Sequence, residues 1–290
     1  MPAAQTISDL LDPKNDYVFF RVFSEEPELL VDLINAVRVD EPPIVAVTLL
    51  DARLSPERLS GKRLILDLKA VDEQGRRYNV EMQVRSFGVW SARGILYLAR
   101  VISEQLEAGE EYHKLKPVIG IHLLDFNLFK EPEHEDQALW CFELRDAKRP
   151  EVRLGRELQL NIVELRKADK LQQLPERLSA WIAYFEHWRE EVTMSKLTHP
   201  PVQQAYAKLQ TLSADEQARY WAESRAKALS DEATLLFEAR EEGEKEGRRQ
   251  SAMAMLRRTQ LDDATVAELT GLSLADVQGL RMGSIEGIKG

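Results

Sequence analysis

The residues whose types and spacing best suit chemistry are Asp67, Glu81 and Gln83, which fall in the segment LILDLKAVDEQGRRYNVEMQV. Each half of this segment alternates apolar and polar side chains, which predicts two half-buried strands. The EQG sequence between them fits a three-residue hairpin turn with Gly75 in the left-handed conformation. The three side chains are therefore expected on one polar face of a hairpin.

The register of that hairpin would bring the two carboxylates together. If Asp72 pairs with Arg76 across the turn, residues whose numbers sum to 148 face each other, and Asp67 lies opposite Glu81. Facing carboxylates destabilise a strand pair unless something positive lies between them. Gln83 points to the same side as Glu81, because side chains two apart on a strand share a face. We therefore expect a divalent metal ion at this position.

The chemistry that these side chains favour is metal-assisted hydrolysis of a phosphodiester. Mg²⁺ is bound through one or two carboxylates and keeps several waters. It would polarise the phosphate and lower the pKa of a bound water, and Gln83 would position the attacking water. The alternative is a polar strand face exposed to solvent, with no chemical role.

Basic residues around the hairpin are the next feature. The chain of 290 residues has a formal net charge of −10, so it is not a general basic nucleic-acid binder. Residues 58–100 nevertheless hold nine basic and four acidic side chains. Such local charge can guide a polyanion, although an ordinary solvated surface is the alternative. The residues expected to hold a phosphate backbone are Lys62, Arg63, Lys69, Arg77, Arg85 and Arg93.

Other kinds of chemistry lack their motifs. Cys141 is the single cysteine, so no intrachain disulfide and no thiol metal site can form. The chain has no HExxH pattern, no GxxxxGK[ST] loop and no GxSxG elbow. It also lacks a signal-peptide pattern and any apolar run of about 18 residues. We therefore expect a soluble cytoplasmic protein that does not contact a membrane.

The segments around the hairpin predict the elements that position it. The helices expected from apolar spacing cover residues 16–23, 25–37, 91–108, 171–190 and 213–224. The last of these would begin with Ser213 and Glu216 as a capping box. The strands expected outside the hairpin cover residues 44–50, 117–126, 139–144 and 158–165. This order predicts a layered α/β (α+β) fold with a mixed sheet.

The C-terminal part predicts a different kind of structure. Residues 230–258 form a long charged helix containing Gly243 and Gly247, each of which weakens a helix by roughly 1 kcal/mol relative to Ala. Residues 263–281 predict two short helices that resemble a helix-turn-helix in outline. Before Arg281, only Gln278 in the second helix is suited to reading bases. We therefore favour packing or homo-oligomerisation over DNA reading as the role of this tail.

Four segments together resemble a known family: DYVFFRVF, LLVDLINAV, KRLILDLKAVDEQGRRYNVEMQV and ARGILYLARVISEQLEAGEEYHKLKPVIGIHLLDFNLF. They resemble the recombination-promoting nuclease (Rpn) family, whose members are also described as transposases and belong to the PD-(D/E)xK nuclease superfamily. The resemblance covers residues 12–129 and continues more loosely through LNIVELRK and the glycine-punctuated tail. It implies a restriction-endonuclease-like core with a mixed sheet flanked by helices. The expected domains are a nuclease-like domain over 1–170, a helical extension over 171–229 and an accessory tail over 230–290.

The resemblance implies roles for particular residues. Asp67 and Glu81 occupy the metal-binding acidic positions, and the backbone carbonyl of Met82 is a further ligand. Gln83 stands where the superfamily usually has Lys, so it can orient water but cannot stabilise negative charge. A nearby Arg or Lys would have to supply that charge. Asp16 matches an acidic residue of the first helix that can reach the metal, and the alternative is that it caps this helix.

The helix after the hairpin also matches the family pattern. Arg93, Tyr97 and Gln105 are spaced to lie on roughly one helical face. They would either face the site or hold the helix against the sheet.

The activity that the resemblance implies is that of a Mg²⁺-dependent endodeoxyribonuclease, with Mn²⁺ as a second suitable ion. It would be linked to DNA recombination or transposition, and phosphate contacts would give it little sequence specificity. One alternative is a nuclease-fold module that is catalytically weak or inactive and binds nucleic acid or a partner protein. Another is a helical oligomeric scaffold built on the C-terminal part.

Overall fold

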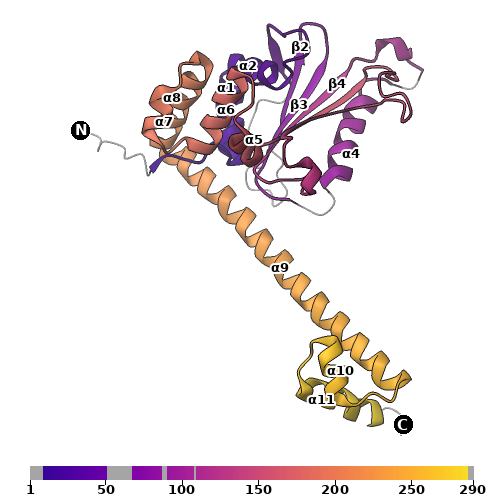
Figure 1. The fold of residues 1–290 in the computed structure, drawn as a ribbon. Coiled ribbons are helices and arrows are strands. Elements are labelled where there is room, and N and C mark those ends of the chain that lie inside the picture. The colour runs from indigo at the N-terminus through magenta and orange to yellow at the C-terminus, as the bar shows by residue number, and fades with distance from the viewer. Residues whose placement is uncertain (1–8, 51–66, 87–89, 108, 287–290) are drawn as a thin grey trace. The chain divides into compact units, whose positions relative to one another are not determined.

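The computed structural model describes residues 9–50, 67–86, 90–107 and 109–286 of the chain (Figure 1). Within them, β2 (Leu68–Asp72) and β3 (Arg77–Gln83) form the expected antiparallel hairpin. Leu68 pairs with Val80, which confirms the register in which residue numbers sum to 148. Gly75 has a φ of +80°, so the turn uses the left-handed conformation as expected. The expected strand residues 64–66 lie outside the described residues, as do Lys62 and Arg63.

The hairpin belongs to a mixed sheet. In the described part of the chain the strand order is β1-β2-β3-β4-β6-β5. The other strands are β1 (Val47–Leu49), β4 (Val118–Leu124), β5 (Leu139–Glu143) and β6 (Leu158–Glu164). β3 pairs in parallel with β4, and β4 with β6, whereas β1 and β5 run antiparallel to their neighbours. The predicted layered α/β fold with a mixed sheet is confirmed.

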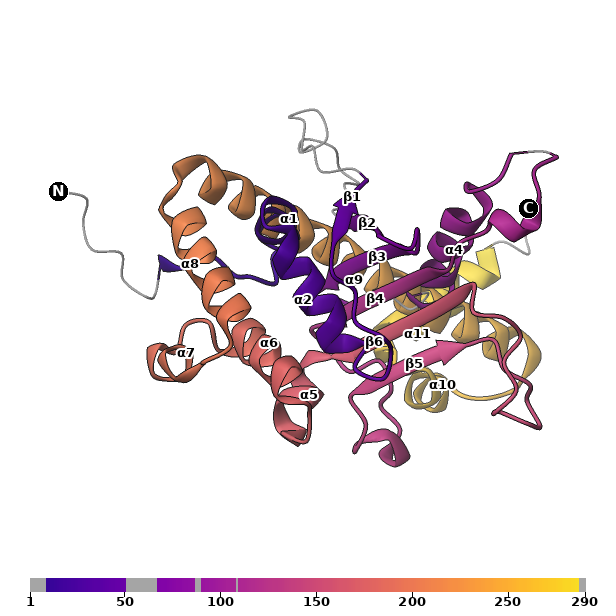
Figure 2. The same cartoon turned by 90° about the horizontal axis from the view of Figure 1, so that it is seen from above.

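Helices cover both faces of the sheet (Figure 2). One face packs against α1 (Asp16–Glu25) and α2 (Pro27–Val37), and α6 (Glu176–His187) and α8 (Pro200–Ala214) pack against these two helices. The core on this side includes a cluster of rings contributed by α1 and α6: Phe19, Phe23, Trp181 and Phe185. The opposite face packs against α4 (Trp90–Ser103), whose Leu98 lies among Val118, Leu124 and Leu160. The α4 face is the one that carries Glu81, because Val80 and Met82 point into the other core.

Burial of β3 differs from the sequence prediction. The alternating pattern predicted a half-buried strand, yet every residue from Tyr78 to Met82 is buried. β3 is an interior strand between β2 and β4, and α4 packs against β4 on the face of the sheet that carries the polar side chains of β3, so both faces of β3 lose contact with water. Asn79 and Glu81 are consequently 2% and 8% exposed.

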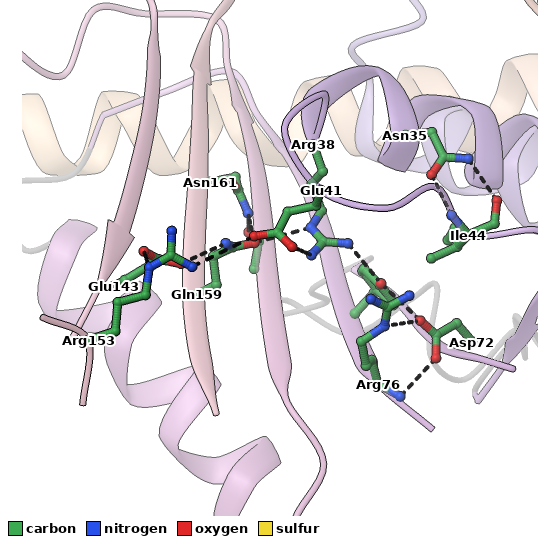
Figure 3. Close-up of polar contacts among 12 residues, drawn as sticks. Asn35, Arg38, Glu41, Ile44, Asp72, Arg76, Glu143, Arg153, Gln159 and Asn161 are labelled. Atoms are coloured by element: carbon green, nitrogen blue, oxygen red, sulfur yellow. Dashed lines mark hydrogen bonds and ion pairs between the residues drawn. The ribbon is translucent and has the colours of Figure 1, made fainter. Parts of the chain in front are cut away.

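A polar network lies on the other face of the hairpin, beneath α2 (Figure 3). The Asp72 carboxylate accepts hydrogen bonds from Arg76 Nε at 2.5 Å and from the Tyr78 hydroxyl at 3.0 Å. Arg38 donates to Tyr78 Oη and to Gln159 Oε1, each at 3.1 Å, and so joins the hairpin to β6. The backbone N–H groups of Gln74 and Arg76 also donate to Asp72, both at 2.9 Å. The Asp72 carboxylate is thus fully used by neighbouring donors.

Several helix boundaries differ from the predictions. α4 ends at Ser103 instead of reaching residue 108, and the short helix α5 (Leu165–Leu171) was not predicted. The predicted capping box is wrong, because Ser213 lies inside α8 and its hydroxyl accepts from the Leu11 N–H at 2.9 Å. Asp215 begins the next helix instead, accepting from the N–H groups of residues 217 and 218. The remaining short elements are α7 (Glu191–Lys196), η2 (Tyr112–Lys114) and η3 (Pro132–His134).

The chain divides into two compact units, residues 1–226 and 227–290. The long helix α9 (Glu216–Arg258) passes from one into the other and stays helical through Gly243 and Gly247. In the second unit, α9 packs with α10 (Asp263–Thr270) and α11 (Leu274–Glu286) around Ala252, Val266 and Val277. The two predicted short helices are confirmed. Whether residues 171–229 fold as a unit of their own stays a prediction. No helix in the described ranges is long and apolar enough to cross a membrane.

Candidate functional site

Glu81 is the centre of the polar group on the α4 face of the sheet. Its Oε1 accepts a hydrogen bond from Gln83 Nε2 at 2.5 Å, so the two side chains point to one side as expected. Burial raises the pKa of the Glu81 carboxyl above its ordinary value, and the Gln83 hydrogen bond and the Arg93 charge offset only part of that rise. The Glu81 carboxylate therefore has a neutral hydrogen-bond donor, the Gln83 amide, and a bound cation would stabilise it more.

Two further oxygens on this face have no donor. Asn79 Oδ1 and Gln83 Oε1 are buried and accept no hydrogen bond from any described residue. They flank Glu81 at a spacing of two residues along β3, so all three side chains face α4. Buried acceptors are normally satisfied by protein, water or a bound group. This row of oxygens therefore has spare capacity for water or a cation.

Asp67 immediately precedes β2 and is partly buried. The Leu68–Val80 pair ends the recorded ladder, and one further step in the same register sets Asp67 opposite Glu81. The Gln83 carbonyl accepts from the Asp125 N–H at 2.8 Å, on the β4 side. Successive carbonyls of a strand point to alternate edges, so the Met82 carbonyl points toward the β2 side. Met82 thus presents its carbonyl to the edge from which Asp67 comes.

His122 is a neighbour of Glu81 that sequence reasoning missed. The parallel pairing of β3 with β4 sets His122 beside Glu81, and His122 Nδ1 lies 3.6 Å from Glu81 Oε2. Burial lowers the pKa of His122 to about 4, and the charge of Arg93 adds to the decrease, so the ring is neutral at pH 7. The one available signal was a polar residue within the apolar strand PVIGIHLLDF. The residue beside His122 is set by the pairing of β3 with β4, and no local sequence pattern predicts that pairing.

The prediction that Arg93, Tyr97 and Gln105 share one helical face holds for the first two residues and is wrong for Gln105. The Arg93 guanidinium lies over the Tyr97 ring, 5.6 Å from its centroid, near the first turns of α4. Gln105 lies beyond the end of α4 and is not on that face. Its amide instead exchanges two hydrogen bonds with the backbone of Lys116, at 2.9 and 3.0 Å, just before β4. Gln105 therefore fixes the chain where it enters the sheet.

A second acidic group closes the carboxyl end of β4. Asp125 forms ion pairs with Lys14 and Arg166, each at 3.0 Å. Burial alone would raise the pKa of Asp125, but the hydrogen bonds from Arg166 and Lys14 outweigh it, and the pKa is lowered. Lys14 also binds Glu186 of α6 at 3.1 Å. This group contacts the site through the Gln83 carbonyl and holds that end of β3 in place.

Asp16 begins α1 and forms an ion pair with Arg225 of α9 at 2.5 Å. The N-cap of α1 is Asn15, whose Oδ1 accepts from the N–H groups of Tyr17 and Val18. Asp16 Oδ1 also accepts from the Tyr17 N–H, at 2.8 Å. A role for Asp16 as a metal ligand stays a prediction.

The predicted phosphate-binding residues within the described ranges are all partly exposed. They are Lys69, Arg77, Arg85 and Arg93. Lys69 pairs with Asn79, two steps along the ladder from the expected Asp67–Glu81 pair. Arg77 begins β3, roughly 13 Å from Glu81 along an extended strand.

The donor set suits a hard, oxygen-preferring cation such as Mg²⁺. In the part of the chain that the structure describes, no three His, Cys, Asp or Glu side chains come together as a metal-binding group. Mg²⁺ does not require three, because one or two carboxylates and several waters suffice. Asp67, Glu81 and the Met82 carbonyl are the oxygen donors expected to hold such an ion, and Gln83 Oε1 is a buried acceptor on the same strand as Glu81.

Comparison with known families gives one match. Residues 13–239, well over half of the chain, match the model of a family described as "PD-(D/E)XK nuclease family transposase". No curated protein and no solved structure matches the chain significantly.

Proposed function

Because the chain belongs to the PD-(D/E)XK nuclease family of transposases, we propose that it is a Mg²⁺-dependent endodeoxyribonuclease linked to DNA recombination or transposition. The observation that carries this proposal is the buried Glu81 carboxylate on the α4 face. Its one hydrogen bond recorded within the described residues comes from the neutral Gln83 amide, and continuation of the register sets Asp67 opposite it. Such an arrangement is costly to a protein unless the carboxylates bind a cation.

The chain's own groups have separate tasks in this proposal. Asp67, Glu81 and the Met82 carbonyl would hold Mg²⁺, with Mn²⁺ as a substitute. The bound ion would supply polarisation of the phosphate and a lower pKa for a bound water. Gln83 would orient the attacking water, because its Nε2 is fixed on Glu81 while its Oε1 remains free to accept from that water. His122 would keep its neutral ring against Glu81 and exclude solvent from that side.

DNA would be held by its backbone. Lys69, Arg77 and Arg85 are partly exposed on or next to the hairpin, and Lys62 and Arg63 precede it. Contacts to phosphates position the duplex without reading its sequence, so cleavage should show little sequence preference. They should also make binding strongly dependent on salt concentration.

A plasmid-nicking assay tests the proposal. The full chain should convert supercoiled plasmid to nicked or linear forms with Mg²⁺ or Mn²⁺ and not with EDTA. Glu81→Ala and Asp67→Ala should each abolish cleavage while the circular dichroism spectrum is unchanged. Glu73→Ala removes an exposed carboxylate from the turn of the same hairpin and serves as the matched control. Wild-type rates in both site variants would refute the assignment.

A non-enzymatic nuclease-fold module is the competing function. It gains support if the wild-type chain neither cuts DNA nor gains thermal stability with either metal ion, yet still retards DNA in a gel. In that case Gln83, which replaces the usual Lys, would mark a site that has lost its chemistry.

We further propose that the chain forms a homo-oligomer through α9. Residues 234–251 of this helix are exposed all round, and they include Leu235, Leu236 and Phe237, which are 66%, 52% and 62% exposed. Three consecutive large apolar residues in water favour burial against another surface. Replacing all three with Ser should lower the molar mass measured by light scattering, whereas Gly243→Ala on the same helix should not. An unchanged molar mass in the triple variant would refute this interface.

A further inference from the structure

The path of α4 over the sheet fixes which of its residues can reach the site. A Cβ added at Gly94 would lie 3.5 Å from His122 Cε1, and one added at Gly120 would lie 3.1 Å from the Leu98 side chain. Four residues of helix and two of strand both span about 6 Å. The helix axis therefore runs back along β4, with Gly94 over His122 and Leu98 over Gly120.

This path places Arg93 on the turn of α4 that lies over His122, the neighbour of Glu81. Gly94 contacts the His122 ring, and that ring lies 3.6 Å from Glu81. Arg93 adjoins Gly94, and its guanidinium is held over Tyr97, one turn further along the helix. The guanidinium is partly exposed, so a phosphate could still reach it.

We propose that Arg93 is a catalytic residue that contacts the scissile phosphate and supplies the positive charge that Gln83 lacks. This assignment rests on the proposed nuclease function. It follows from two positions. A neutral amide lies on β3 beside Glu81, and a guanidinium belongs to the turn of α4 that lies over His122, the neighbour of the same carboxylate. The cation is supplied by the helix instead of the strand.

Arginine suits this task for chemical reasons. Its planar fork donates two hydrogen bonds to the oxygens of one phosphate and remains charged at every physiological pH. Negative charge on those oxygens is best stabilised by donors that are already in place. The contact with Tyr97 restricts the Arg93 side chain, so less conformational entropy is lost when the phosphate binds.

A purely structural role for Arg93 makes a different prediction. If Arg93 only neutralised Glu81, its loss would lower stability or metal affinity, and saturating metal would restore the rate. If it only bound the DNA backbone, its loss would raise KM and leave kcat unchanged. A catalytic contact instead lowers kcat at saturating metal and DNA.

The experiment compares Arg93→Gln with Arg100→Gln in the full chain. Arg100 is an exposed residue on the same helix, so its variant controls for loss of one positive charge from α4. At saturating Mg²⁺ and plasmid, Arg93→Gln should lower kcat by about 10²–10³-fold, whereas Arg100→Gln should change it less than about twofold. Guanidinium ions at millimolar concentration should raise the kcat of Arg93→Ala by about tenfold and leave wild type unchanged.

A double variant that moves the positive charge from α4 to β3 makes the test more specific. Gln83→Lys in the Arg93→Gln background returns the cation to the strand and should recover about tenfold of the lost rate. A kcat within about twofold of wild type for Arg93→Gln, or a loss confined to KM, would overturn the assignment while leaving the nuclease function intact. A wild-type chain that does not cut DNA would overturn the nuclease function itself.

Discussion

Two buried carboxylates on the same hairpin have opposite surroundings. Asp72 lies on the α2 face, where Arg76, the Tyr78 hydroxyl and two backbone N–H groups donate to it (Figure 3). Glu81 lies on the α4 face and accepts from Gln83, with the neutral ring of His122 at 3.6 Å. Asp72 has no acceptor capacity left for a ligand, whereas Glu81 has.

The difference between the surroundings of Asp72 and Glu81 indicates that one buried carboxylate stabilises the fold and the other suits a functional site. A carboxylate surrounded by charged and hydrogen-bonding donors contributes to a specific fold, because removal of one partner leaves the others unsatisfied. A buried carboxylate whose pKa stays raised despite a neutral donor and a nearby charge favours binding of a cation, as expected of a functional site. We expect the same isosteric change, carboxylate to amide, to have opposite consequences at the two positions.

The largest expected effect is on cleavage. Glu81→Gln should lower the rate of plasmid nicking by at least about 10³-fold, because an amide cannot replace a metal-binding carboxylate. Asp72→Asn should cut at the wild-type rate at a temperature where it is folded. Comparable losses in both variants would show that the two carboxylates do not differ in function.

The next effect is on stability, and here the Asp72 variant should be affected more than the Glu81 variant. Asp72→Asn should lower the free energy of unfolding by about 3 kcal/mol, because it leaves the partly buried Arg76 beside a neutral partner and removes the acceptor of the Tyr78 hydroxyl. Glu81→Gln should not lower it in the absence of metal. Urea unfolding followed by tryptophan fluorescence measures this for the sheet-containing unit alone, since all five tryptophans lie within residues 1–226. A loss below about 1 kcal/mol for Asp72→Asn would contradict the network's role.

Metal binding should also distinguish Asp72 from Glu81. The expected difference in stability is similar in size to that of Asp72→Asn. At a hundredfold excess over its dissociation constant, Mg²⁺ or Mn²⁺ should stabilise the folded protein by about 2.7 kcal/mol. Thermal unfolding should show this shift in wild type and in Asp72→Asn but not in Glu81→Gln. A shift that persists in Glu81→Gln would place the metal elsewhere.

The smallest effect concerns pH. Because burial raises the pKa of Glu81, the folded state keeps this proton to a higher pH than the unfolded chain, whose value is about 4.3. Between the two values the folded state binds more protons, so the free energy of unfolding falls as pH rises. In EDTA, wild type should therefore lose stability relative to Glu81→Gln as pH increases through this window. Parallel pH curves for the two proteins would contradict the raised pKa.

The local features of the site were predictable from the sequence. Alternation and the EQG turn fixed the hairpin register, which the Leu68–Val80 pair and the positive φ of Gly75 confirm. The shared face of Glu81 and Gln83 followed from spacing alone. Each of these depends on residues within about five positions of one another or across a single turn.

The features that were missed depend on long-range pairing. His122 reaches Glu81 only because β3 pairs in parallel with β4 after a crossover through α4, and no local pattern specifies that neighbour. The same pairing makes β3 an interior strand, so its polar face is buried. Ser213 was assigned to a cap because its spacing to Glu216 fits one, yet its contact with Leu11, 202 positions away, keeps it inside α8.

The exposed stretch of α9 has a consequence for the lifetime of the intact chain. Within a single chain the side chains of residues 234–251 are all exposed, so little buried surface resists local opening, and Gly243 and Gly247 lower the cost of unwinding there. Arg240, Lys245 and Arg248 are trypsin sites within this stretch. Limited proteolysis should therefore cut here first and release a protected fragment that contains residues 1–226. A protease could in this way separate the nuclease unit from its tail without unfolding either one.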